Sequence, residues 1–129
     1  MSIENAIIAK IAALNTGAGA RIYREIIVQE PTLPAIAVSR TSGQGIARTL
    51  ASNNPLLYRA VLRIETVGET MAQVAPVADA IRSGLDGWSG TQSGLVILLS
   101  RLSQQTEQAD AMGDRTMRIV QQDFEFIYR

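Results

Sequence analysis

The sequence contains no cysteine and no histidine. Without cysteine the chain can form no disulfide bond and no thiolate nucleophile, and without either residue it has no ligands for a Cys- or His-bound zinc ion. Catalytic acids, bases and triads that depend on histidine are excluded as well. The lack of cysteine is neutral about compartment, because only a disulfide framework would indicate secretion. Composition thus removes many enzyme classes before any motif is considered.

The chain has no excess of charge of either sign. Twelve basic residues balance twelve acidic ones, and no block of like charge occurs, so a nucleic-acid binder driven by counterion release is not expected. Lys10 is the single lysine, and the other basic residues are arginines. Arginine forms planar, bidentate contacts that suit protein interfaces, although chance composition explains the bias equally simply. A neutral surface offers little electrostatic resistance to self-association.

Long hydrophobic runs are also missing. The longest, Leu95 to Leu99, is far shorter than the roughly 20 residues that a membrane-spanning helix needs. Near the N-terminus an apolar stretch lies between Glu4 and Lys10, an order of charges that does not fit a signal peptide. From the sequence we expect an intracellular protein without a membrane segment.

What is present is enough for one domain covering residues 1–129. The 13.9 kDa chain is 47% hydrophobic, which argues for a globular core. Periodicity predicts a helix, two short strands, a loop, a strand, a second helix and two more strands. We therefore expect an α+β fold with a mostly antiparallel sheet of about four to five strands and two main helices packed on one face. The expected elements are a helix over 3–14, an extended segment within 21–28, strands over 35–40 and 58–67, a helix from Thr70 to about Leu85, and strands over 95–102 and 116–128.

Local signals define both helices. Ser2 is a plausible N-cap for the first, whose apolar residues recur at helical spacing, with Gly17 as its stop. The second opens with a capping box at Thr70 and Gln73. Pro76 conflicts with a regular helix, so the second helix either bends there or begins near residue 75.

The strands are less evenly marked. Alternation is clearest over 58–65, where one face is apolar and the other mixed. In the last strand the apolar residues change face between Ile119 and Phe124, which predicts a bulge. Thr41 to Pro55 is expected to be a long loop, and Glu107 to Asp114 a polar turn.

Motifs with possible chemistry are weak. Gly43-Gln44-Gly45 lacks the third glycine of a dinucleotide fingerprint and reads as a flexible loop. Gly87-Trp88-Ser89-Gly90-Thr91 lacks the final glycine of a nucleophile elbow and reads as a turn, with Trp88 packing on the sheet edge. The acidic residues at 107, 110 and 114 do not have calcium-loop spacing. We expect no catalytic, cofactor-binding or metal-binding residues.

Four arginines are the remaining signal: Arg40 and Arg48 flank the expected loop, and Arg59 and Arg63 share the polar face of the strand over 58–67. They either make ordinary surface ion pairs or lie at subunit interfaces, where desolvated arginine contributes strongly.

Taken in order, these elements resemble the tail terminator, or tail completion, proteins of long-tailed bacteriophages and phage-like particles. The resemblance covers nearly the whole chain and depends on the order and spacing of segments rather than on one motif. The segments that carry it are the N-terminal helix leading to Arg21-Ile22-Tyr23, then Leu33 to Val38, the long loop, the strand over 58–67, the helix through Ala78-Asp79-Ala80-Ile81, the glycine-rich turn and the C-terminal strand ending Asp123 to Tyr128.

The resemblance implies a non-enzymatic virion protein, made in the host cytoplasm, that forms a homo-oligomer, expected to be a hexameric ring. Such a ring would cap the head-proximal end of the tail tube, contact the tube protein and the neck or connector protein, and let DNA pass through its lumen without specific binding. The candidate subunit or tube contacts are Arg40, Ile46, Arg48, Leu50, Leu56, Leu57, Arg59 and Arg63.

Two alternatives remain open. The chain could be a head-closure or neck protein, which would bind the portal side rather than the tube. It could also be a small cytosolic α+β enzyme or ligand-binding domain, which a deep pocket with convergent arginines and a perturbed carboxylate would favour.

Overall fold

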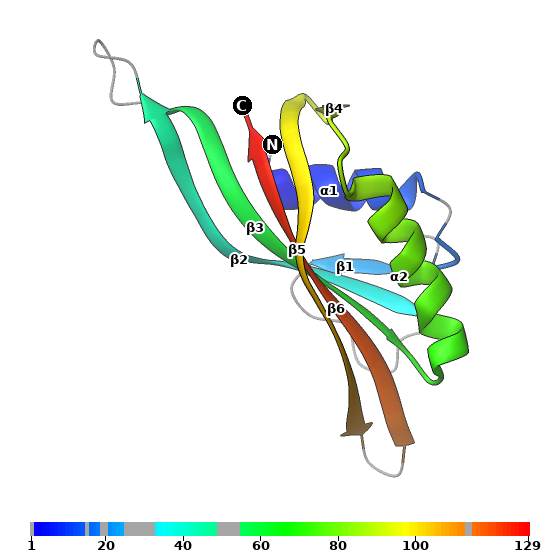
Figure 1. The fold of residues 1–129 in the computed structure, drawn as a ribbon. Coiled ribbons are helices and arrows are strands. Elements are labelled where there is room, and N and C mark those ends of the chain that lie inside the picture. Colours follow the sequence, from blue (N-terminus) through cyan, green and yellow to red (C-terminus); the bar gives the residue numbers. More distant parts are fainter. Residues whose placement is uncertain (1, 15, 19–20, 25–32, 49–54, 113–114) are drawn as a thin grey trace.

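The computed structural model describes residues 2–14, 16–18, 21–24, 33–48, 55–112 and 115–129. Two helices and six strands form an α+β fold (Figure 1). In chain order the elements are α1 (Ile3–Ala12), β1 (Ile22–Arg24), β2 (Ala35–Arg48), β3 (Pro55–Gly68), α2 (Met71–Leu85), β4 (Gly90–Gln92), β5 (Leu95–Met112) and β6 (Arg115–Tyr128).

The strands form one sheet in the order β1-β2-β3-β6-β5-β4. The pair β1 and β2 is parallel, and every other pair is antiparallel. The sheet therefore has six strands and is mixed, where four to five mostly antiparallel strands were expected. The short strand β4 accounts for the additional strand. Its three residues follow a glycine-rich turn and are too few to show an alternating pattern.

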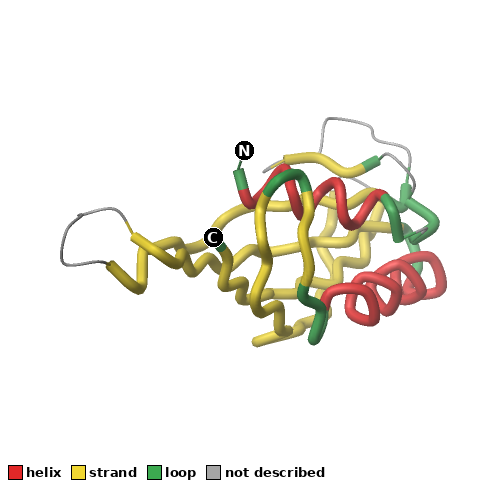
Figure 2. Tube along the Cα trace, turned by 90° about the horizontal axis from the view of Figure 1, so that it is seen from above, coloured by secondary structure: helices red, strands yellow, loops and turns green. Residues whose placement is uncertain are grey.

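Two long hairpins shape the molecule. The β2–β3 hairpin projects away from both helices, and the β5–β6 hairpin reaches to the opposite end of the sheet (Figures 1 and 2). The expected loop over 41–55 was wrong, because β2 continues to Arg48 and β3 begins at Pro55. The expected polar turn over 107–114 was wrong in the same way, because β5 continues to Met112. In both cases the sequence is rich in glycine or glutamine and shows no strand pattern, and the strand is defined by its pairing with a neighbouring strand.

Both helices pack on the same face of the sheet. The core combines one stripe from each helix with the alternating inward residues of β2, β3 and β6, and Phe124 and Phe126 are its largest members. Of the apolar stripe predicted for β3, Ala60, Leu62 and Ile64 are fully buried as expected, whereas Tyr58, near the start of the strand, is 38% exposed. The opposite face of the sheet is not covered by either helix, so we call it the open face.

The helix ends follow the predicted signals. The Ser2 hydroxyl accepts a hydrogen bond from the Asn5 amide, and the Thr70 hydroxyl accepts one from the Gln73 amide. The helix α2 begins at Met71 and contains Pro76, so it does not start near residue 75. The Gln73 side chain accepts from the Glu69 amide and donates to the Leu33 carbonyl, which ties the start of α2 to the chain entering β2.

Register irregularities fall on other strands than expected. The ladder between β3 and β6 is uninterrupted, so the bulge predicted in the last strand is absent from its pairing with β3. The shifts occur instead in the β2–β3 ladder and, at Leu98 and Ser103 of β5, in the β5–β6 ladder. Because β6 stays regular, its odd-numbered residues point to the open face and its even-numbered ones to the core, and Gln122 is buried there with its amide nitrogen donating to the Ala78 carbonyl of α2.

Candidate functional site

The open face of the sheet carries a cluster of ion pairs centred on β6. Register places Arg63 of β3 directly opposite Asp123, and Arg101 of β5 directly opposite Glu125. Arg63 Nε lies 3.1 Å from Asp123 Oδ1, and Arg101 Nε lies 2.8 Å from Glu125 Oε1. Arg59, one diagonal step along β3, also forms an ion pair with Glu125. We call these five residues the arginine–carboxylate cluster.

The acidic and the basic side chains of the cluster are buried to different extents. The Glu125 side chain is 7% exposed and that of Asp123 is 12% exposed, whereas the three arginine side chains are 39–61% exposed. The guanidinium groups therefore lie over the carboxylates and form the outer layer of this part of the open face. Such a surface presents guanidinium groups whose positive charge is partly offset by the two carboxylates beneath them.

Electrostatics agrees with this arrangement. The hydrogen bond from Arg59 is the main reason that the pKa of Glu125 is lowered from its ordinary value, and the charge of Arg101 acts in the same direction against the cost of burial. The hydrogen bond with Asp123 raises the pKa of Arg63. The Glu125 carboxylate is thus held in its ionised form, as an ion-pair partner rather than as a proton donor.

The structure separates the side chain of Arg40 from those of Arg59 and Arg63. Arg40 points to the helix side, where its Nε lies 2.8 Å from Glu4 Oε1 of α1. Burial acts to raise the pKa of Glu4, but a backbone hydrogen bond and the interactions with Arg40 and Arg24 outweigh it and lower that pKa. Arg40 therefore fastens the start of α1 to β2 and takes no part in the open-face cluster.

The other predicted contact residues belong to the β2–β3 hairpin. Leu57 is half-buried on β3. Ile46, Arg48 and Leu56 lie within the strands, but their side chains are outside the described part of the structure, and Leu50 lies outside the described residues altogether. The structure thus brings Arg59 and Arg63 together on the open face. Four of the other predicted contact residues, Ile46, Arg48, Leu56 and Leu57, belong to the paired strands β2 and β3.

Sequence reasoning missed Arg101, Asp123 and Glu125. A signal for the acids was available, because Asp123 and Glu125 alternate with Phe124 and Phe126 and so had to point away from the core. What the sequence could not give was the strand register that sets them against Arg63 and Arg101.

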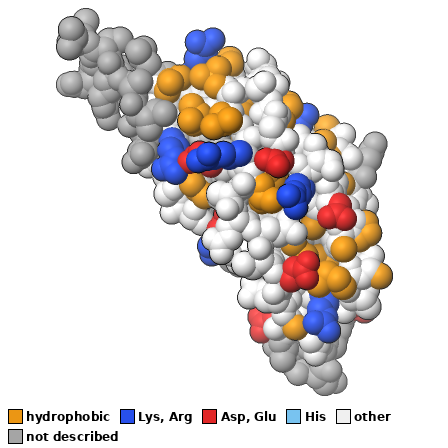
Figure 3. Space-filling view, viewed as in Figure 1, with side chains coloured by type: hydrophobic (Ala, Val, Ile, Leu, Met, Phe, Trp, Pro, Cys, Tyr) orange, Lys and Arg blue, Asp and Glu red, His pale blue; other side chains and the backbone are white. Residues whose placement is uncertain are grey.

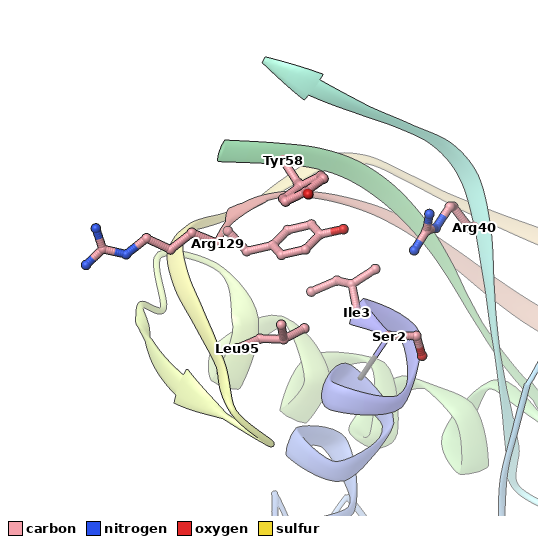
Figure 4. A pocket seen from close by; sticks show the side chains of 7 residues that line it. Ser2, Ile3, Arg40, Tyr58, Leu95 and Arg129 are labelled. Carbon is pink, nitrogen blue, oxygen red and sulfur yellow. The ribbon is translucent and has the colours of Figure 1, made fainter. Parts of the chain in front are cut away.

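A pocket of about 300 Å³ lies beside the N-terminus of α1 (Figure 4). Tyr58 and Tyr128 stack at a centroid distance of 5.5 Å on one side of it, and Ile3 and Leu95 line it from below. Burial raises the pKa of Tyr128. The described lining includes Arg40 but no carboxylate, so it has no acid–base pair, and Arg59 and Arg63 lie on the other face of the sheet.

Surface chemistry elsewhere is mixed. Basic, acidic and hydrophobic side chains lie next to one another on the face seen in Figure 3. Leu98 and Leu99, at the first irregularity of β5, are exposed by 43% and 37%.

Within the described ranges no group of three acidic residues is arranged to hold a metal ion. No helix in those ranges is both long and apolar enough to cross a membrane.

Comparison with known proteins gives a fold but no family. No protein-family model matches the chain, and no curated protein matches it. Among solved structures, a chain of the virion of the native gene transfer agent particle is similar with a TM-score of 0.60 at 15% identity, covering 98% of this chain and 94% of that one. A second solved structure has a TM-score of 0.55 at 13% identity, covering 96% and 89%. The chain thus shares its whole fold, end to end, with a component of a phage-like particle.

Proposed function

We propose that this protein is a structural component of a phage-like virion, and specifically a tail terminator that forms a ring at the head-proximal end of the tail tube. The observation that carries the proposal is the likeness to the gene transfer agent virion chain, which covers 98% of this chain and 94% of that one. The order of segments in the sequence independently resembles tail terminators. The proposed partners are further copies of the chain, the tube protein and a neck or connector protein.

The absence of enzymatic activity is part of the proposal. The chain has no histidine or cysteine, and Arg40, which lines the described pocket, is already ion-paired with Glu4 of α1. The ionisable residues whose pKa values are lowered, Glu4 and Glu125, are both held by arginine. These side chains fasten strands and helices, which supports an assembly role over the alternative of a small enzyme or ligand-binding domain.

The open face fits a surface that DNA passes without being held. Three guanidinium groups would bind phosphates if they were free. Here the carboxylates of Asp123 and Glu125 lie beneath them and offset two of the three positive charges. A lumen lined by this face would be polar and hydrated, and it would attract the DNA duplex only weakly.

The mass of the assembly tests the proposal. A single 13.9 kDa domain is too small to surround a DNA duplex, so the function requires an oligomer. Mass photometry of the purified protein, alone and with tube protein, should show a ring of about six subunits, the size expected from the resemblance to tail terminators. A monomer under both conditions would contradict the proposal. Binding to portal protein but not to tube protein would favour the head-closure alternative.

A further inference from the structure

The distal half of β5 is a strand without a core beneath it. Every residue from Ser103 to Asp110 is exposed, although each of them lies within the strand. Before this segment the outer edge of β5 is covered, since β4 pairs with residues 95–97 and the end of α2 bonds to Ser100 and Leu102. Within the described part of the chain nothing pairs with that edge from Gln104 to Met112.

This edge also lacks the usual protection against pairing. Natural edge strands are blunted by charged side chains, especially lysine, by proline or by a covering segment; the segment 104–112 contains no lysine or proline, and its charged residues are Glu107 and Asp110. Its side chains are mostly glutamine, threonine and alanine, which neither build a core nor repel another strand. The β6 residues that lie opposite residues 105, 107 and 109 direct their backbone N–H and C=O groups towards β3. On β5, the backbone N–H and C=O groups of residues 105, 107 and 109 therefore point outward, away from β6.

The opposite edge of the sheet is open in the same way. The strand β1 pairs only with residues 36–38 of β2, and no described residue pairs with the outer edge of β2 from Arg40 to Arg48. The two open edges are equal in length. They are complementary in charge, because the β2 edge contains Arg48 whereas the β5 edge contains Glu107 and Asp110; Arg40, at the start of the β2 edge, is already paired with Glu4.

Strand direction fits a repeated contact between these edges. The strands β2, β3, β6 and β5 form an antiparallel run, so β5 points opposite to β2. In a ring all copies have the same orientation along the axis, and β5 of one copy therefore meets β2 of the next antiparallel. We propose that the ring, whose existence rests on the proposed function, is closed by antiparallel pairing of the open β5 edge of each copy with the open β2 edge of its neighbour.

The stagger of the edges sets the tilt of the strands. The open part of β2 lies level with residues 55–62 of β3, whereas that of β5 starts level with residue 63. A shift of about eight residues of about 3.3 Å each, across four strands about 4.8 Å apart, corresponds to a tilt of roughly 54°. The proposed ring therefore requires strands tilted more steeply than the roughly 35–45° typical of closed barrels.

Cysteine trapping tests the contact directly, because the natural chain has no cysteine to confuse the result. Gln44→Cys lies midway along the open β2 edge and Gln108→Cys midway along the open β5 edge, and both positions belong to the open face. Oxidation of the double variant should yield a ladder of disulfide-linked multimers up to the ring. Each single variant should yield no linked species. The control variant Gln44→Cys with Asp79→Cys, which moves the second thiol to the exposed side of α2, should give no ladder.

Charge reversal provides the second arm. One variant has Glu107→Arg and Asp110→Arg, and the other has Gln44→Glu and Arg48→Glu. Each alone should lose assembly, and an equal mixture should regain it because the reversed edges match each other.

The outcomes separate the contact from the function. Rings seen by electron microscopy without a ladder would overturn the edge contact and leave the proposed function standing. A ladder from a protein that does not cap tubes would overturn the function and leave the contact standing. Linked dimers from a single variant would show pairing of identical edges and overturn the proposal, and so would a mixture of charge variants that stays monomeric.

Discussion

Replacing Glu125 with glutamine tests whether the open-face cluster acts through charge. The side chain is 7% exposed and forms ion pairs with Arg59 and Arg101, which are themselves 39% and 61% exposed. An exposed pair of this kind contributes up to about 1 kcal/mol, and the half-exposed arginines can return to water when the carboxylate is lost. We therefore expect Glu125→Gln to reduce the free energy of unfolding by about 1–2 kcal/mol, which lowers Tm by about 4–8 °C in a domain of this length.

The pH dependence gives the sign of the effect. The folded state lowers the pKa of Glu125 below its ordinary value of 4.5, so the unfolded chain takes up the proton first as the pH falls. The stabilisation is present in full above the ordinary pKa and is lost as the pH falls through the lowered one. Wild type and Glu125→Gln should therefore differ at neutral pH and converge in acid.

Thermal unfolding by circular dichroism at fixed protein concentration, repeated from neutral to acid pH, is the assay. Asp79→Asn serves as the control, because Asp79 is exposed and should shift the unfolding free energy by less than about 0.5 kcal/mol. Equal stability of wild type and Glu125→Gln at neutral pH would refute the reasoning. An undiminished difference in acid would show that shape, rather than charge, accounts for the loss.

Three further predictions concern the core, a helix cap and a buried phenol. Phe124→Ala should cost about 3–5 kcal/mol in urea unfolding because the ring is fully buried, whereas Leu98→Ala, at an exposed site, should be nearly neutral. Thr70→Ala should cost about 1 kcal/mol by removing the acceptor for the Gln73 amide, and Thr70→Ser should restore most of it; equal stability of all three proteins would contradict the cap. Burial raises the pKa of Tyr128 above 10.0, so stability should fall as the pH rises beyond that value, and Tyr128→Phe should reduce this loss of stability in alkaline thermal unfolding.

Sequence patterns predicted best the elements that pack against the core. Most residues that periodicity selects in α1, α2 and β3 are buried, because a buried face must be apolar at the period of its backbone. The exceptions lie at the element starts, where Met71 of α2 is half-buried and Tyr58 of β3 is exposed. The helix caps at Ser2 and Thr70 could also be predicted from the sequence, since each depends on residues within one helical turn.

The distal halves of the hairpins could not be predicted in this way. Residues 103–110 face solvent on both sides, so no alternation marks them as a strand, and only their hydrogen bonds to β6 do. The glycine-rich residues 41–48 of β2 likewise show no clear apolar alternation in the sequence, and their pairing with β3 identifies them as a strand. The partners of Arg59 and Arg63 required the register between strands far apart in the chain, which no local pattern encodes.

Electron microscopy of growing tail tubes tests the central claim most directly. Purified tube protein is allowed to polymerise with and without this protein, and tube lengths and tube ends are compared. If the protein terminates tubes, it should appear as a ring on one end only, and tubes that carry it should stop growing at that end. Tubes of unchanged length with bare ends, in the presence of excess protein, would contradict the account.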